Sequence, residues 1–251
     1  MRNLTLSVAL LLAASATASH ADTPDGWTGE ASLTGSRTTG NTDTTDVGLG
    51  LKLRNEDGLW RHNFKARFDY GRASGNTNKQ RLGLGYQLDR DIGDRVYLFG
   101  SGDYFEDDFG AFSENWFVGG GLGYDVLLPL DGDATPMSWK VQGGLGYRSQ
   151  TAAHDGVLPA GVDSLTNEGV AFSAGSDWDW TLNDHVSLYN DTELLSFSTD
   201  TYIWNETGLT ATLWGDLAAR LSFRIDHHTD VPLGREKTDT ISRVGVVYTM
   251  K

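Results

Sequence analysis

Residues 60–70 read Trp-Arg-His-Asn-Phe-Lys-Ala-Arg-Phe-Asp-Tyr. Apart from His62, every second residue from Trp60 is apolar or aromatic, and the residues between are charged or carry an amide. This period of two predicts a β-strand with one apolar and one polar face. A soluble sheet gives the same alternation, but aromatic residues at both ends of the apolar face are typical of a strand that crosses an outer membrane and backs onto a polar lumen.

The composition permits such a protein and excludes several others. The chain has 251 residues, with 31 Gly, 5 Pro, 8 Trp, 9 Tyr and 10 Phe, which suits many strands with aromatic belts better than helices. No apolar run reaches the roughly 18 residues that a membrane helix needs, although a barrel strand needs only alternate apolar residues. A net charge of -14 argues against a nucleic-acid partner. The absence of cysteine excludes disulfides, a thiol nucleophile and thiolate metal sites.

The first 21 residues have the pattern of a secretory signal peptide. Arg2 precedes the apolar run Leu4–Leu12, and small residues then lead to Ser19-His20-Ala21. We expect cleavage after Ala21 during Sec-dependent export, which leaves residues 22–251 as one domain. The alternative is a short amphipathic anchor helix, but the apolar run is short and a cleavage site follows it.

Roughly twelve alternating segments separated by turn residues follow from Trp27 onward. The predicted fold is therefore all-β, a transmembrane up-and-down antiparallel β-barrel of about 12 strands. The sequence does not determine which side chains of segments 96–105 and 202–213 point outward, because apolar residues occur at both odd and even positions there. The segments are expected near residues 27–38, 46–54, 60–70, 81–89, 96–105, 116–126, 139–148, 170–180, 186–197, 202–213, 219–227 and 244–250.

The connections between these segments indicate an orientation. Even-numbered connections, counted from the first hairpin, are mostly short turns, and several odd-numbered ones are long, including 72–79, 150–167 and 229–237. Short periplasmic turns and longer extracellular loops predict this pattern when both termini are periplasmic. The acidic residues 106–108 are also expected in an outer loop, where they would either bind divalent cations that bridge lipopolysaccharide or simply be solvated.

Several short motifs, in this order and spacing, carry a resemblance to a known family over about residues 27–250. The sequence resembles the YdiY-like family of salt-induced outer-membrane proteins, a domain of unknown function. The resemblance implies an outer-membrane barrel and supplies no activity, ligand or catalytic residue. The sequence departs from the family in one respect. Such chains commonly end on an outward aromatic residue that the insertion machinery recognises. Here Met250 occupies that position, and Tyr248 is the nearest aromatic residue. The motifs are Thr39–Asp43, Trp60–His62, Tyr97–Gly100, Gly144–Arg148, Lys237–Thr240 and Val246–Tyr248.

Charged residues of both signs share the face predicted to line the lumen. A basic wall that favours anions is one interpretation. The alternative, which the even supply of both signs favours, is a network of ion pairs that fills the lumen. Inward glycines such as Gly48 and Gly123 are expected to make room for larger side chains opposite. The predicted lumen residues are Arg61, Lys65, Arg67, Asp69, Arg81, Lys140, Arg148, Asp191, Glu193, Arg220, Arg224 and Asp226, with Glu30 and Asp177 on the same face.

Aromatic residues on the outer face are predicted to form a girdle at the membrane interfaces. The expected partners are outer-membrane lipids, lipopolysaccharide and the barrel-insertion machinery, without nucleic acid, and no solute is indicated. The predicted girdle residues are Trp27, Trp60, Tyr70, Tyr86, Tyr124, Trp139, Tyr147 and Trp180.

Other classes of function are less well supported. Asp226, His227 and His228 resemble a metal site, but strand alternation sends the two histidines to opposite faces. An outer-membrane lipase would need an outward serine near His62 or His227, and the neighbouring segments offer none. We therefore predict no enzyme and no catalytic, cofactor-binding or metal-binding residue. The expectation is a narrow passive channel or a structural, stress-responsive component of the Gram-negative cell outer membrane; a soluble periplasmic barrel that binds a small ligand is the rival.

Overall fold

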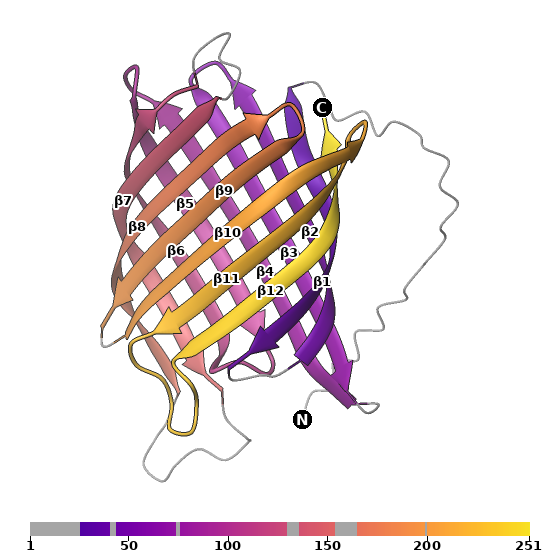
Figure 1. The fold of residues 1–251 in the computed structure, drawn as a ribbon. Helices are drawn as coiled ribbons and strands as arrows, with labels where there is room; N and C mark the ends of the chain where they lie inside the picture. Colours follow the sequence, from indigo (N-terminus) through magenta and orange to yellow (C-terminus); the bar gives the residue numbers. More distant parts are fainter. Residues whose placement is uncertain (1–25, 41–43, 74–75, 130–135, 154–164, 199) are drawn as a thin grey trace.

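The computed structural model describes residues 26–40, 44–73, 76–129, 136–153, 165–198 and 200–251. The predicted signal peptide, residues 1–21, lies outside them. The described residues form twelve β-strands (Figure 1), and none of them belongs to a helix able to cross a membrane. The strands are β1 (Trp27–Thr39), β2 (Thr44–Asp57), β3 (Trp60–Ala73), β4 (Asn76–Asp91), β5 (Val96–Asp107), β6 (Phe112–Leu127), β7 (Met137–Ala152), β8 (Thr166–Asn183), β9 (Val186–Phe197), β10 (Asp200–Trp214), β11 (Leu217–His228) and β12 (Thr238–Met250).

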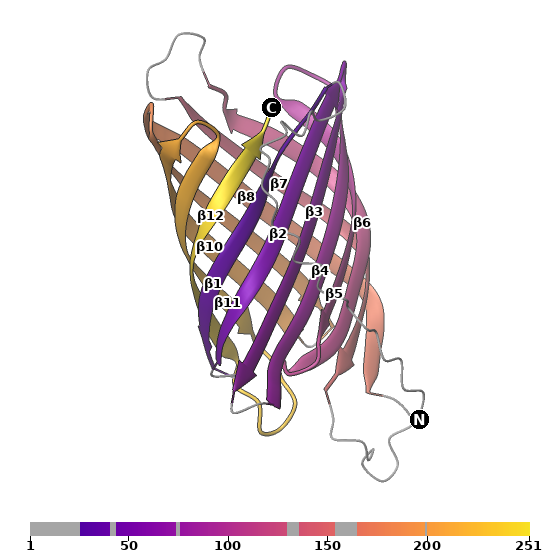
Figure 2. The same cartoon turned by 90° about the vertical axis from the view of Figure 1, so that its right-hand side faces the viewer.

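The sheet closes on itself. Each strand pairs antiparallel with its neighbours in the chain, and β1 also pairs with β12. This seam runs from Gly29 opposite Met250 to Thr39 opposite Thr240, and Figure 2 shows the two tilted strands side by side. Closure pairs the backbone groups that the first and last strands would otherwise leave open. The prediction of a twelve-stranded up-and-down antiparallel barrel is confirmed.

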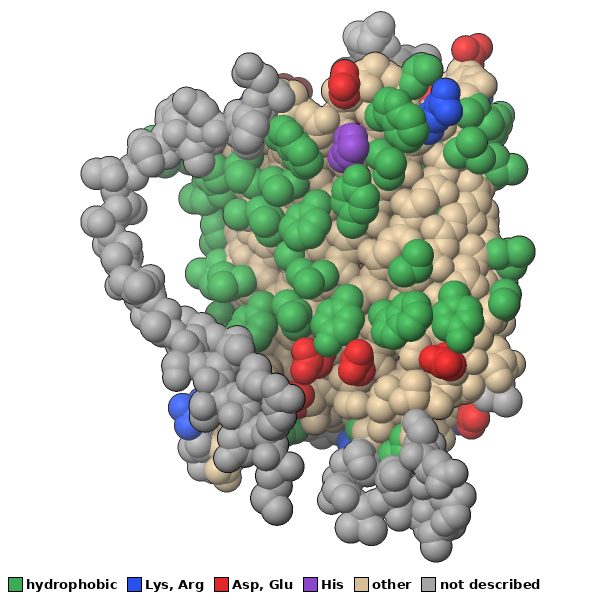
Figure 3. Space-filling model, turned by 180° about the vertical axis from the view of Figure 1, so that it is seen from behind, with side chains coloured by type: hydrophobic (Ala, Val, Ile, Leu, Met, Phe, Trp, Pro, Cys, Tyr) green, Lys and Arg blue, Asp and Glu red, His purple; other side chains and the backbone are tan. Residues whose placement is uncertain are grey.

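The two faces of the barrel are inverted relative to a soluble protein. Large apolar side chains such as Leu33, Val118 and Leu145 are more than half exposed on the outside, whereas Asp69 and Arg148 are buried inside. On the face drawn in Figure 3, hydrophobic side chains gather in an upper group and a lower row, with acidic side chains just below that row. The alternation in the sequence therefore sorts apolar side chains outward and polar ones inward.

The structure shows which side chains point inward in β5 and β10, the two strands for which the sequence does not determine this. In β5, Leu98 is exposed outside, and Tyr97 and Phe99 are buried inside. Tyr97 fits because its ring lies over Gly123 of β6, where an added Cβ atom would come within 2.0 Å of it. In β10, Trp204 points inward and its indole N–H donates to Glu193 at 3.0 Å. An inward aromatic is therefore accommodated by a glycine or a carboxylate on the neighbouring strand.

The strands are longer at one end of the barrel than the alternation predicts. The predicted polar loop 72–79 is wrong, since β3 continues to Ala73 and β4 begins at Asn76. The predicted acidic loop 106–108 is also wrong in part, because β5 includes Asp107. β7 likewise continues to Ala152, and β8 already begins at Thr166. Backbone pairing continues here beyond the point where the outer residues stop being apolar, so hydrophobic periodicity gives no signal for it.

Trp27 and Met250 lie at one end of the barrel, which we call the termini end; the opposite end is the loop end. The connections at the termini end are short except for 128–136, as predicted. At the loop end, 153–165 and 229–237 are long, but only residues 74–75 separate β3 from β4. The length difference is therefore confined to a few connections.

Candidate functional site

The barrel encloses a cavity of about 380 Å³, near the lower limit of roughly 300–1,000 Å³ for small-molecule pockets. Interior side chains of every strand except β8 line it. Gly110, Ala111 and Lys237 line its outer part, so the cavity reaches the connections of the loop end. The candidate functional site is therefore the lumen itself.

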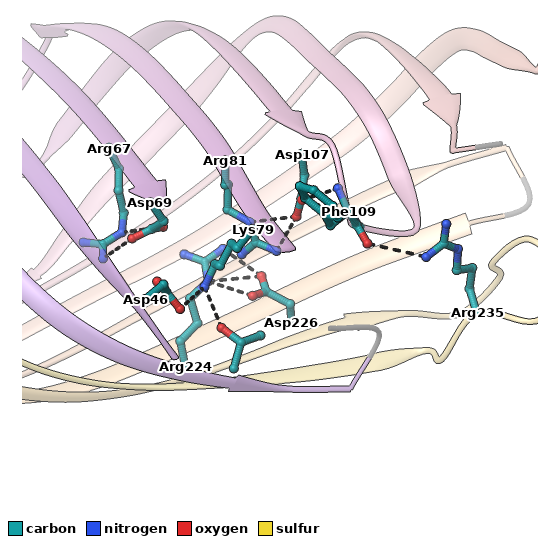
Figure 4. Close-up of polar contacts among 12 residues, drawn as sticks. Asp46, Arg67, Asp69, Lys79, Arg81, Asp107, Phe109, Arg224, Asp226 and Arg235 are labelled. Atoms are coloured by element: carbon teal, nitrogen blue, oxygen red, sulfur yellow. Dashed lines mark hydrogen bonds and ion pairs between the residues drawn. The ribbon is translucent and has the colours of Figure 1, made fainter. Parts of the chain in front are cut away.

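Toward the loop end, the wall of this cavity carries ion pairs formed by two residues of the same strand (Figure 4). Arg67 and Asp69 are two residues apart on β3, so their side chains share the inner face, and their closest nitrogen and oxygen atoms are 2.7 Å apart. Arg224 and Asp226 repeat the arrangement on β11 at 2.8 Å. The Arg224 guanidinium also lies 4.1 Å from the centre of the Trp204 ring, which holds it flat against the wall.

A third pair in this region, Lys79 with Asp46, lies outside the residues that the sequence predicts for the lumen. Lys79 is almost fully buried, and its Nζ atom lies 3.0 Å from Asp46 Oδ1 and donates to Thr38 Oγ1 at 2.6 Å. Ser36 donates to the other oxygen of Asp46. The predicted loop 72–79 includes Lys79, but Lys79 lies on β4 two residues before the inward Arg81, so strand alternation points it into the lumen as well.

Asp107 belongs to the lumen rather than to a loop. It accepts hydrogen bonds from Arg81 at 2.6 and 2.8 Å and from the backbone N–H groups of Phe109 and Gly110 at 3.0 Å. Its two oxygens are therefore occupied, so it is not free to hold a cation between lipopolysaccharide molecules. In the following turn, burial raises the pKa of the Asp108 carboxyl, and the charges of Glu106 and Asp107 raise it further.

Contacts bridge the connections at the loop end. Arg235, in the connection between β11 and β12, donates to the carbonyl of Phe109 at 3.4 Å in the connection between β5 and β6 (Figure 4). The rings of Phe112 and His228 lie 4.8 Å apart, and His228 Nδ1 lies 2.7 Å from Asp200. The Arg235–Phe109 and Phe112–His228 contacts join parts of the barrel that are far apart around its wall, whereas His228 and Asp200 lie on the neighbouring strands β11 and β10.

A separate network lies toward the termini end. Arg61 is 2.8 Å from Asp91 and 3.7 Å from Asp125 on β6, and its guanidinium lies 4.5 Å from the centre of the Tyr97 ring. Gln87 on β4 and Gln142 on β7 exchange hydrogen bonds at 3.0 and 3.3 Å. Side chains therefore reach between non-adjacent strands here too.

Between these two networks the charges are less tightly paired. Lys65 of β3 lines the cavity, and no carboxylate in the described part of the chain comes within 4.0 Å of its ammonium group. It still interacts electrostatically with Asp103 of β5, Asp177 of β8, and Asp191 and Glu193 of β9. We call Lys65, Asp103, Asp191 and Glu193 the mid-lumen group.

Nine of the twelve predicted lumen residues line the cavity. Arg61, Asp69 and Lys140 do not: Arg61 belongs to the termini-end network, Asp69 is buried beneath Arg67, and Lys140 lies opposite Asp125 and Asp177 in the strand register. Arg243 and Glu206, 2.7 Å apart, form a further lumen pair outside the predicted set, because β12 begins at Thr238, six residues before the predicted start at 244, and the sequence leaves the facing of segment 202–213 open. The nine are Lys65, Arg67, Arg81, Arg148, Asp191, Glu193, Arg220, Arg224 and Asp226.

Six predicted girdle residues are exposed, and Trp27 and Trp180 are partly exposed. Trp60 pairs with Asp57 next to a turn of the termini end, and Tyr70 lies toward the other end of β3. Tyr86, away from the strand ends, lies 2.8 Å from His62 Nδ1. Their position at membrane interfaces stays a prediction. The six are Trp60, Tyr70, Tyr86, Tyr124, Trp139 and Tyr147.

The two histidines of the sequence that resembles a metal site, His227 and His228, point to opposite faces of β11, as strand alternation predicts. His228 lines the cavity with Asp226, whereas His227 lies beside Thr238, with its Nδ1 2.8 Å from the hydroxyl oxygen. No group of three or more potential metal ligands is found in the described ranges.

Solved structures with a similar fold include a porin and an autotransporter translocator domain. NanC porin aligns with a TM-score of 0.54 and 11% identity, over 87% of this chain and 98% of that one. The translocator domain of the autotransporter NalP from Neisseria meningitidis aligns with a TM-score of 0.50 and 14% identity, over 91% and 90% of the two chains. At these identities the likeness concerns the fold. A comparison with curated proteins gives no match.

The sequence itself matches one family model, described as "Protein of unknown function, DUF481", over residues 31–250. This range covers nearly the whole of the predicted barrel and agrees with the resemblance drawn from the motifs between Thr39 and Tyr248. The chain therefore belongs to the DUF481 family.

Proposed function

We propose that this protein is an outer-membrane β-barrel that forms a narrow, water-filled passage for small ions. The observation that carries the proposal is a charge-lined cavity of about 380 Å³ inside a closed barrel whose outer face is apolar. An apolar exterior suits contact with lipid chains, and a polar interior suits water and ions.

The outer surface supports this location. Exposed Leu, Val and Phe side chains around the barrel would aggregate in water and are stable against lipid. The partners are then outer-membrane lipids and lipopolysaccharide. Sec-dependent export through the predicted signal peptide, and insertion machinery that reads the outward Tyr248 of β12, would bring the chain there.

The width of the passage is limited by the contacts that cross it. Arg61 and Asp125 approach each other near the termini end, and Arg235 reaches Phe109 at the loop end. These contacts leave no wide opening of the kind found in barrels of 16–18 strands. Small hydrated ions are the solutes that fit such a lumen.

A structural envelope component is the second candidate, favoured by the ion pairs that join different strands. Arg81 with Asp107 links the neighbouring strands β4 and β5, and Arg220 with Glu30 links β11 to β1 across β12, each at 2.6 Å. Such a network would stiffen the barrel wall whether or not ions pass. The two candidates differ only in conductance.

Fractionation and gel mobility test the location. We expect the protein in the outer-membrane fraction, and we expect the folded form to migrate differently from the boiled form on a denaturing gel. Recovery from the periplasm, with no change in mobility on heating, would contradict a membrane barrel.

Planar-bilayer recording tests conduction. Pure, folded protein should give discrete steps of small conductance in potassium chloride. Correctly folded protein that gives no steps would favour the structural role.

A further inference from the structure

The basic side chains along the cavity are mostly neutralised where they stand. Arg67, Arg81 and Arg224 each have a carboxylate within 2.8 Å. Arg220 and Arg243 are held in the same way by Glu30 and Glu206, at 2.6 and 2.7 Å. Along most of the wall a passing ion therefore meets basic groups whose charge a nearby carboxylate offsets.

The mid-lumen group is the exception. Lys65 on one wall faces three carboxylates, those of Asp103 on β5 and of Asp191 and Glu193 on β9, and all four residues line the cavity. None of the three carboxylates has a basic group within 4.0 Å in the described part of the chain. Trp204 donates to Glu193 at 3.0 Å, which fixes that carboxylate without neutralising it. Lys52, which also lines the cavity, acts on Asp191, so three carboxylates stand against the two ammonium groups of Lys65 and Lys52.

Small residues leave this part of the lumen open. Gly50, Gly83 and Gly85 line the cavity on the strands beside Lys65. Asp103 lies over Gly85, where an added Cβ atom would come within 2.8 Å of its Oδ1 atom. All three carboxylates therefore border the free space of the cavity, where an ion would experience their charge directly, although Glu193 is also held by Trp204.

From this arrangement we infer that the passage prefers cations to anions, and that Asp103, Asp191 and Glu193 determine the preference while Lys65 opposes it. The inference rests on the proposed conduction. Unpaired carboxylates in a narrow lumen attract cations and repel anions, because the surrounding protein focuses their field. The result is the reverse of the anion preference that a basic wall would give.

The reversal potential across a gradient of potassium chloride measures this preference. We expect wild-type protein in a planar bilayer to pass potassium more readily than chloride. Asp191→Asn combined with Glu193→Gln should lower the potassium-to-chloride permeability ratio toward unity. Lys65→Gln should raise the ratio, because it removes the opposing charge. Asp184→Asn, in the exposed turn between β8 and β9, is the matched control and should leave the ratio unchanged.

The outcomes separate the inference from the function it rests on. No conductance from folded wild-type protein would contradict the proposed passage. Conductance with a preference for chloride, or a ratio that stays the same in both lumen variants, would overturn the cation preference alone. Each variant is first checked for the change in gel mobility on heating. If the double variant does not fold, the opposite shift expected for Lys65→Gln still decides the question.

Discussion

At the scale of single residues, Lys79 and Asp46 form the most completely buried ion pair among the described residues. Both side chains are almost completely removed from solvent, so each charge has lost its hydration. The attraction between them and the hydrogen bonds from Ser36 and to Thr38 offset that loss. Removal of one partner leaves the other charged, buried and uncompensated.

We therefore expect Lys79→Met to lower the free energy of unfolding by about 3–5 kcal/mol. The double variant Lys79→Met with Asp46→Leu should recover most of the loss, because neither charge remains to be desolvated. Urea unfolding of the refolded barrel in lipid vesicles, followed by the fluorescence of its 8 tryptophans, measures this. Lys251→Met, which removes an exposed pair with Asp216, is the control and should cause no comparable change. Equal loss in the single and double variants would contradict the argument.

At the scale of strands, the outer faces of β9 and β10 depart from the apolar pattern of the rest. Asn190 and Thr192 pair with Thr207 and Asn205 in the register, on the face opposite the inward Asp191 and Glu206. Asn190 donates to Asn205 and Thr207 at 3.2 and 2.7 Å and accepts from Asn205 and Thr192 at 3.1 and 3.3 Å. The polar groups satisfy one another, which lets them face outward without water.

This mutual satisfaction predicts an asymmetric response to substitution. Asn190→Leu leaves the Asn205 carbonyl oxygen without its donor, although the Asn205 NH2 group keeps Thr192 at 2.7 Å, and should cost about 1–3 kcal/mol of stability. Adding Asn205→Leu removes that unsatisfied oxygen and should recover part of the loss, because Thr192 and Thr207 still lack their amide partners. The same urea experiment measures both variants, and a double variant weaker than the single one would show that the cluster has another role.

At the scale of the whole molecule, one seam decides whether the sheet becomes a barrel. β1 and β12 are the strands farthest apart in the chain, and their pairing is the last contact that closure requires. Gly245 of β12 packs tightly there, since an added Cβ atom would come within 2.4 Å of the Leu33 carbonyl oxygen. Gly35 lies on the same seam with room to spare, its nearest such contact being 4.0 Å.

Gly245→Val should therefore impair closure, because the backbone of β1 would have to move away. We expect a large loss of the heat-sensitive folded band on gels after refolding. Gly35→Val is the matched control and should keep that band. Efficient folding of both variants would show that the seam tolerates displacement.

Much of this architecture could be predicted before the structure. Alternation between Trp60 and Tyr70, repeated along the chain, predicted the strand number, the inward and outward faces and the closed antiparallel order. It did not predict the strand ends near Lys79 and Asp107, because backbone pairing continues there without an apolar outer face. It also left Tyr97 unassigned, since an inward aromatic depends on Gly123 of the next strand.

The sequence by itself determined which side chains share a face, because a period of two is a local property of the extended backbone. Only the tertiary structure decided which charges meet. Arg81 lies beside Asp107 and Arg220 beside Glu30 because strand register and closure bring together residues far apart in the chain. The same geometry leaves Lys65 facing Asp103, Asp191 and Glu193 without a close partner. Which charges of the lumen are paired and which stay unpaired is therefore a consequence of register and closure, which no single strand contains.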